Sequence, residues 1–300
     1  IAPFDGIFSA HGMVLRPRED IIDKSFFPLF ISSDYFLDAA IKISVGSLSP
    51  TINWRDLKTL EFELPDLATQ RKLAETLWSI NETMEAYKKL ISATDELVKS
   101  QFMEQFGSYL GDETRCATVE QVCTVFADGD WIESKDQADD GIRLIQTGNV
   151  GNGVYLDKGE RARYIDEETF VRLNCTEVLP NDILISRLPD PVGRACIIPD
   201  GLGKSITAVD CSIVRLKSHV LPEFFVAYTM TTLYAAQIGS SVTGSTRKRI
   251  SRKNLGQVVI PTPDIDQQEQ FAAFVRQSDK SKFAAQSCSN DNLSRCLAIP

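Results

Sequence analysis

One short segment carries the densest positive charge of the chain, and this charge could bind a polyanion. Residues 246–253 read Thr-Arg-Lys-Arg-Ile-Ser-Arg-Lys, which places five cations in eight positions. Clustered lysine and arginine side chains neutralise the phosphates of nucleic acids. The whole chain has a net charge of −9, so we expect a focused basic contact on an otherwise acidic protein. The alternative is a solvated basic turn.

The patterns that would support catalysis are incomplete. Gly201-Leu-Gly-Lys-Ser205 resembles the end of a phosphate-binding loop, but Ile198 stands where that loop needs its first glycine. The glycines of residues 148–153 are better explained by a hairpin turn. The acids of residues 128–140 lack the lysine of a nuclease core, and we interpret them as a solvated loop. The sequence therefore predicts a protein that is not an enzyme.

Metal and redox chemistry find equally little support. The seven cysteines form no Cys-x-x-Cys pair, and two histidines, His11 and His219, are too few to complete a zinc site with such scattered thiols. Two histidines also leave little for general-base catalysis. We therefore expect free thiols in a reducing cytoplasm, no metal and no cofactor.

Length and composition describe an ordinary globular chain. Its 300 residues suffice for one large domain or two smaller ones, and 43% of them are hydrophobic. No uncharged apolar run approaches the roughly 18 residues that cross a bilayer, so we expect no membrane partner. The chain begins at Ile1 without a basic-then-apolar leader, and we expect a fragment or a processed product.

Two copies of one unit organise the chain, related by an offset of 198 residues. Without a gap, this offset takes Phe26-Phe27 to Phe224-Phe225, Gly46-Ser47 to Gly244-Ser245 and Pro65-Asp66 to Pro263-Asp264. Each copy shows helical apolar spacing, then a Gly-Ser loop, a short strand (57–64 or 255–261) and a helix start, where Asp66 or Thr69 in the first copy and Asp264 or Asp266 in the second are the candidate caps. Residues 1–65 match only 199–263, so the first copy lacks a counterpart of residues 117–198.

A long helix is expected after the first copy. No proline or glycine intervenes from Gln70 to Phe106, which allows a helix of about 55 Å. Its apolar residues alternate by four and three positions, as in a coiled coil. We predict that it docks a partner helix through Leu73, Leu77, Ile80, Met84, Tyr87 and Ile91. The alternative is an amphipathic helix packed on a globular core.

The helix of the second copy has a weaker pattern. After its first turns, polar residues such as Ser278 and Lys282 occupy the positions of the apolar seam. We therefore expect it to pair poorly beyond those turns and to end in a loose tail from Ser287. Between the two helices, residues 112–263 are predicted to form one mixed domain. Its strand-like runs are 121–126, 143–147, 183–186, 195–199 and 212–216.

In order, spacing and duplication, these motifs resemble the specificity subunits of type I restriction–modification systems. The end of that family's target recognition domain is similar to Gly46–Ile52 with Leu57, Pro65-Asp66-Leu67 and Gln70, and again to Gly244–Ile250 with Leu255, Pro263 and Gln267-Gln268-Glu269. The early and middle strands of the family look like Ile142–Asn149 and like Asn181–Arg187 followed by Gly193.

The resemblance implies an α+β fold in which mixed α/β target recognition domains join long conserved helices that form an antiparallel coiled coil. It divides the chain into the C-terminal part of a first recognition domain (1–65), a spacer helix (66–107), a complete second recognition domain (112–263), and a second helix with its tail (264–300).

The implied function is to read part of a bipartite DNA site without catalysis. The implied partners are double-stranded DNA, methyltransferase (modification) subunits that carry S-adenosylmethionine, restriction subunits that hydrolyse ATP, and a second copy of the chain. Two alternatives stay open: a truncated scaffold that binds methyltransferase without reading a full site, and the recognition region of a fused restriction–methylation enzyme. Polar and basic residues are the expected DNA contacts: Gln146, Asn149, Arg187, Thr243, Ser245, Thr246, Arg247, Lys248, Arg249, Arg252 and Lys253.

Overall fold

The computed structural model describes residues 7, 9, 12–46, 49–244 and 246–297. The chain divides into two compact units, the first formed by Ile1–Lys89 with Ala285–Pro300 and the second by Leu90–Ala284. Two long helices, α4 (Leu67–Phe106) and α9 (Ile265–Leu297), contribute to both units. No helix among the described residues is long and apolar enough to cross a membrane.

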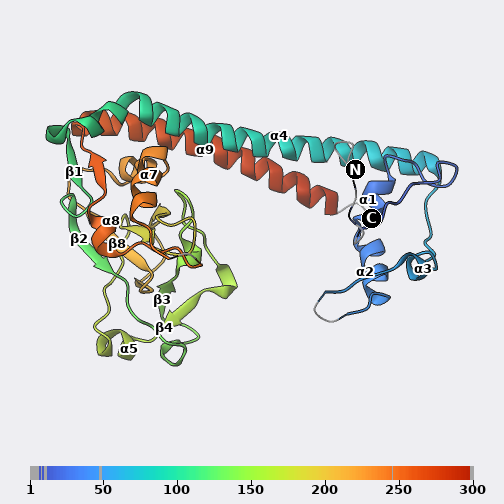
Figure 1. Cartoon of the computed structure of the whole chain (residues 1–300), viewed down its shortest axis with the longest axis horizontal. Coiled ribbons are helices and arrows are strands. Elements are labelled where there is room, and N and C mark those ends of the chain that lie inside the picture. Colours follow the sequence, from blue (N-terminus) through green and yellow to red (C-terminus); the bar gives the residue numbers. More distant parts are fainter. Residues whose placement is uncertain (1–6, 8, 10–11, 47–48, 245, 298–300) are drawn as a thin grey trace. The chain divides into compact units, whose positions relative to one another are not determined.

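Within the second unit, α4 and α9 lie side by side and run antiparallel (Figure 1). Lys282 Nζ lies 2.8 Å from Asp95 Oδ1, while the Phe102 ring packs against Phe271 further along both helices, with 5.4 Å between centroids. The antiparallel helix pair of the predicted α+β fold is thus confirmed. The expected poor pairing is wrong, because Ser278 is small enough to be buried and Lys282 finds a carboxylate across the pair.

The ends of the two helices follow from the local sequence. Two backbone amides of the first turn of α4, those of Ala68 and Thr69, donate to Asp66 Oδ1, so Asp66 caps the helix as expected. The helix ends at Phe106, directly before Gly107. In contrast to the expected loose tail, α9 continues to Leu297, and no glycine or proline interrupts it. Each residue predicted for the seam of α4 is half-buried: Leu73, Leu77, Ile80, Met84, Tyr87 and Ile91.

The described residues of the second unit form three small sheets. An antiparallel four-stranded sheet has the order β2 (Cys123–Asp128), β8 (Cys211–Leu216), β5 (Ile183–Ser186) and β6 (Ala195–Ile197). A three-stranded sheet has the order β4 (Arg163–Ile165), β3 (Ile142–Ile145) and β7 (Ser205–Thr207). Strand β1 (Cys116–Thr118) pairs with β9 (Val259–Pro261). Each predicted strand-like run of this domain overlaps a strand, whereas the three-residue strands β1, β4 and β7 were not predicted.

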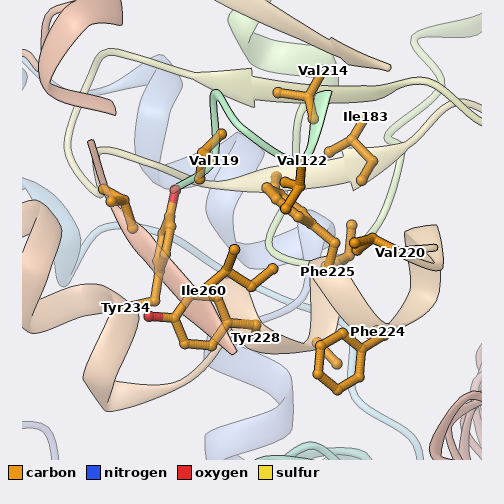
Figure 2. Close-up of a cluster of buried hydrophobic side chains, with 14 of the residues drawn as sticks. Val119, Val122, Ile183, Val214, Val220, Phe224, Phe225, Tyr228, Tyr234 and Ile260 are labelled. Atoms are coloured by element: carbon orange, nitrogen blue, oxygen red, sulfur yellow. The ribbon is translucent and has the colours of Figure 1, made fainter. Parts of the chain in front are cut away.

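Shorter α-helices also pack in the described part of this unit, and one of them forms much of the core. They are α5 (Glu167–Arg172), α6 (Pro222–Thr229), α7 (Thr232–Ser241) and α8 (Arg252–Gly256). Helix α6 is buried almost all round and packs against β6 of the four-stranded sheet. Figure 2 shows Phe225 and Tyr228 of this helix in the same cluster as Ile183 of β5 and Val214 of β8. Apolar burial on this scale fixes the sheet and the loops at its ends.

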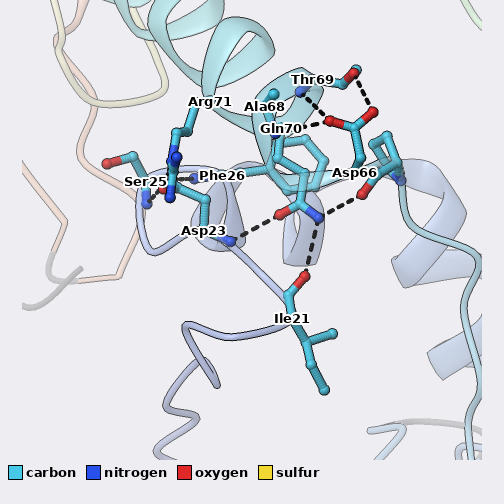
Figure 3. A network of polar contacts seen from close by, with 10 residues as sticks. Ile21, Asp23, Ser25, Phe26, Asp66, Ala68, Thr69, Gln70 and Arg71 are labelled. Carbon is cyan, nitrogen blue, oxygen red and sulfur yellow. Dashed lines mark hydrogen bonds and ion pairs between the residues drawn. The ribbon is translucent and has the colours of Figure 1, made fainter.

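The repeat predicted from the sequence recurs in the structure as the same local hydrogen bonds. In the first unit, Gln70 accepts from the Asp23 amide and donates to the carbonyls of Ile21 and Pro65 (Figure 3). In the second unit, Gln268 accepts from the Leu221 amide and donates to the carbonyls of His219 and Pro263. Each acceptor and donor of the first network is 198 positions before its equivalent. The two copies therefore attach their long helices in the same way.

The first copy contains α1 (Phe27–Ile31), α2 (Asp34–Lys42) and α3 (Trp54–Leu57), but the strand predicted at 57–64 is absent from its described residues. The equivalent strand β9 pairs with β1, whereas residues 57–64 have no strand partner among the described residues. Its aromatic cluster, which includes Phe30, Phe36 and Phe62, is consequently only half-buried, whereas the equivalents Tyr228, Tyr234 and Ile260 are at most 2% exposed.

Candidate nucleic-acid interface

The basic segment forms a hairpin on the surface of the second unit. Thr243 and Arg249 exchange both backbone hydrogen bonds at 2.9 Å, and Gly244 between them adopts φ +93°, a conformation that other residues rarely accept. The side chains of Thr243, Thr246, Arg247, Lys248 and Arg249 are exposed. Ser245, a further predicted contact, lies outside the described residues. The glycine turn therefore leaves the cationic side chains of this polar loop exposed to solvent.

The last two predicted cations stand at the start of α8, directly after the hairpin. Ser251 caps this helix by accepting from the Asn254 amide. The Arg252 side chain contacts β2 of the four-stranded sheet: it donates to the Phe126 carbonyl and lies 3.3 Å from Asp128 Oδ2. The side chain of Lys253 is exposed. Arg252 therefore supports the loop and is partly shielded by the sheet.

The ion pairs of the hairpin are loose. Lys248 lies 3.5 Å from Asp190, and Arg249 lies 3.7 Å from Asp210, with all four side chains at least one third exposed. Within the described part of the chain, Arg247 and Lys253 have no carboxylate at ion-pair distance. Exposed pairs of this kind contribute about 0–1 kcal/mol, so phosphates can replace these carboxylates at little cost.

Arg187 does not belong to the exposed set, which corrects the prediction. Its side chain is only 4% exposed, lies 3.3 Å from Asp128 Oδ1 and donates to the carbonyl of Val209. Its own carbonyl accepts from the Ile250 amide at the base of the hairpin. In this structure the guanidinium is enclosed, and the carbonyl of Arg187 holds the base of the hairpin. The sequence correctly predicted that Arg187 follows a strand, but it could not reveal that the side chain is buried.

Asn149 needs a similar correction, whereas Gln146 does not. Asn149 is buried; its Oδ1 accepts from the Gln146 amide at 3.0 Å, and its Nδ2 donates to the Leu156 carbonyl at 2.9 Å. Both polar groups are therefore used within the segment 146–156. Gln146 is half-exposed and stays a candidate reader. Amide side chains suit the donor–acceptor edge of adenine.

Hydrogen bonds connect this turn to the basic hairpin. Arg194, which the sequence did not single out, donates to the carbonyls of Val150 and Thr147 and to the Ser186 hydroxyl. The strand end at Ser186 continues into Arg187, which holds the hairpin. We use the term recognition face for the turn 146–150, the segment 187–194 and the loop 243–253. The first and the last of these three segments are about 100 residues apart in the sequence.

The described part of the second unit contains no group of three histidine, cysteine or acidic residues that could hold a metal ion. Burial raises the pKa of the Cys123 and Cys196 thiols to about 12, which leaves them protonated and unreactive. The described side chains of the recognition face are mostly hydrogen-bond donors and cations, which suit the binding of an anionic polymer.

Comparison with known proteins agrees with this geometry. The model of the type I restriction modification DNA specificity domain matches residues 1–93 and 113–292. No curated protein sequence matches the chain. A chain from a structural study of complex assembly and conformational transition in the type I R-M system has 17% identity and a TM-score of 0.59, over 95% of this chain and 72% of that one.

The S subunit of the type I restriction-modification system from M. genitalium has 13% identity and a TM-score of 0.51, over 93% of this chain and 71% of that one. At these identities the two structures share a fold with this chain. The family match covers most of the sequence. The chain therefore belongs to the type I restriction modification DNA specificity domain family.

Proposed function

We propose that this chain reads DNA sequence for a type I restriction–modification complex and has no catalytic activity of its own. Its second unit reads one part of a bipartite site, α4 and α9 dock the methyltransferase subunits, and restriction subunits join that assembly. The observation that supports this most directly is the recognition face. It combines exposed cations without tight partners and a half-exposed amide on one compact unit.

Two kinds of contact are expected on this face. Cations that meet phosphates fix the register and bind all sequences alike, whereas groups that meet base edges discriminate between sequences. Arg247 is exposed and unpaired among the described residues, and Arg249 has only a loose partner. An arginine that donates twice to guanine is the commonest specific contact in the major groove. We propose Arg247 and Arg249 as the first candidates for base reading.

The test compares Arg247→Ala and Arg249→Ala with the parent in the reconstituted complex, on cognate and scrambled duplexes at matched salt. Loss of a base contact is expected to weaken cognate binding by about 1–3 kcal/mol and to relax one position of the site. The control is Lys217→Ala, which also removes one exposed cation. Lys217 directly follows β8. It lies at the end of the β2–β8 pair that is farther from Asp128. If both hairpin variants bind cognate DNA as the parent does, the loop does not read DNA.

A second candidate function is supported by the half-buried aromatic cluster of the first copy. In this alternative the chain is a truncated scaffold that binds methyltransferase without reading a full site. A footprint of the assembled complex on a long duplex separates the two functions, because a reading subunit protects its part of the site at a fixed sequence. A scaffold that does not read DNA protects no segment of fixed sequence.

A further inference from the structure

A second concentration of positive charge lies beside the turn 146–150. A hollow of about 250 Å³ is lined by the cations Arg143, Lys158, Arg161 and Arg163 together with Gln146 and Tyr155. No carboxylate lines this hollow. We call it the Arg143 pocket. Four cations at one hollow on a protein with a net charge of −9 form a local site for an anion.

The pairing of two strands builds the pocket from residues that are scattered in the sequence. Strand β3 supplies Arg143 and the antiparallel strand β4 supplies Arg163, with Leu144 opposite Arg163 in the register. The connection between the strands supplies Lys158 and, through a short 3-10 turn at Gly159–Arg161, Arg161. Residues of three chain segments thus line one hollow, although the register places the Arg163 side chain on the face of the sheet opposite to Arg143.

Arg143 forms the fixed back of the pocket. Its side chain is 15% exposed and lies 3.2 Å from the Tyr155 hydroxyl and 3.1 Å from Asp157 Oδ1. Burial acts to lower the pKa of Arg143, but hydrogen bonds with Tyr164 and Tyr155 and the charge of Asp157 raise it above its usual value. This guanidinium therefore stays charged and is held in one orientation before any ligand arrives.

The rim is less constrained. Lys158 and Arg161 are exposed, and among the described residues neither has a carboxylate partner at ion-pair distance. Arg163 donates to a neutral amide, that of Gln137. Among the described residues, Asp157 is the acid at ion-pair distance from these cations, and Arg143 already binds it. The pocket therefore keeps a net positive charge that the protein does not neutralise.

The turn of the recognition face forms one wall of this pocket. Gln146, Gly148 and Asn149 line it, and the side chain of Lys158 passes over Gly148. We propose that the Arg143 pocket holds a backbone phosphate of the DNA strand whose bases meet the turn 146–150. The proposal rests on the proposed DNA-binding function and adds a second anchor to it, separate from the basic hairpin.

The proposal of one bound phosphate predicts how the DNA affinity of the chain depends on salt concentration. Each neutralised phosphate contributes about 0.9 to the slope of log affinity against log salt, independent of sequence. The full chain is titrated by fluorescence anisotropy with a mixed-sequence duplex at several salt concentrations. Lys158→Ala/Arg161→Ala is expected to bind several-fold more weakly than the parent and to have a slope smaller by about 1. The control, Lys217→Ala/Lys280→Ala, removes two exposed cations elsewhere in the second unit and should keep the parent's slope.

The outcomes distinguish a failure of the proposed phosphate pocket from a failure of the proposed DNA-binding function. If the parent binds DNA and the pocket variant matches the control in affinity and slope, the phosphate pocket is wrong while DNA binding stands. If the pocket variant loses affinity for one base at one position only, the pocket reads a base edge and the phosphate assignment is overturned. A parent chain that binds no duplex even at low salt contradicts both the proposed function and the pocket.

Discussion

One acidic residue organises the base of the recognition face. Asp128, at the end of β2, lies 3.3 Å from Arg187 on one oxygen and 3.3 Å from Arg252 on the other, and it accepts from the Ser212 hydroxyl. Arg187 is buried and Arg252 is half-exposed, so the carboxylate connects the interior to the surface loop. We infer that Asp128 and Arg187 act on DNA only through the hairpin that they position.

Asp130, two residues further on, gives a prediction about pH. It accepts from the Thr176 amide at 3.0 Å, yet its pKa is raised, chiefly because burial disfavours the charged form. A raised folded-state pKa means that the folded protein binds the proton more tightly than the unfolded chain. The contribution of Asp130 to stability is therefore fully present below the unfolded pKa of about 3.9 and is lost as pH rises through the folded pKa.

Asp130→Asn keeps a side-chain oxygen for the Thr176 amide but removes the charge. We expect the variant to be more stable than the parent at neutral pH and the difference to shrink as pH falls below about 4. Urea unfolding of both proteins at a series of pH values measures this. Ser134→Ala, which changes an uncharged residue nearby in the sequence, is the control. A stability difference that does not vary with pH would contradict the assignment.

At the scale of elements, the same sequence pattern gave different structures in the two copies. The hairpin and the glutamine network recur in both, because each is built from residues within the copy. The strand does not recur, because β9 needs β1 as its partner. Strands β4 and β7 escaped prediction since three residues are too few to show alternation. Polar residues misled the prediction for α9, where Lys282 pairs with Asp95.

The predicted docking role of α4 can be tested at its half-buried seam. Leu77→Asp/Met84→Asp places charges one heptad apart at that seam and is expected to abolish retention of methyltransferase subunits in a pull-down. The control is Ser79→Asp/Ala86→Asp, which adds the same charges with the same spacing at exposed positions of the helix. Circular dichroism of both variants shows whether the helices persist. Undiminished assembly of the seam variant would rule out docking through these residues.

At the scale of the whole molecule, the sequence revealed the family and the basic hairpin but missed the Arg143 pocket. The hairpin was visible because its cations are consecutive, and 247–249 stay on one loop in any fold. The pocket cations are spread over residues 143–163 with Asp157 and Glu160 among them, so the local charge looks mixed. Only the pairing of β3 with β4 brings them together. Burial of Arg187 and Asn149 was likewise a property of the folded unit.

The last prediction concerns activity. The purified chain should neither methylate nor cut DNA in the presence of S-adenosylmethionine, ATP and magnesium, because it lacks the motifs that bind the cofactor and perform either reaction. Adding methyltransferase subunits should produce methylation at specific sites, and Arg247→Ala should change which sites are methylated more than the rate per bound complex. Methyl transfer is measured with radiolabelled cofactor on plasmid DNA. Methylation or cleavage by the chain alone, after removal of contaminating subunits, would show that the chain carries a catalytic site.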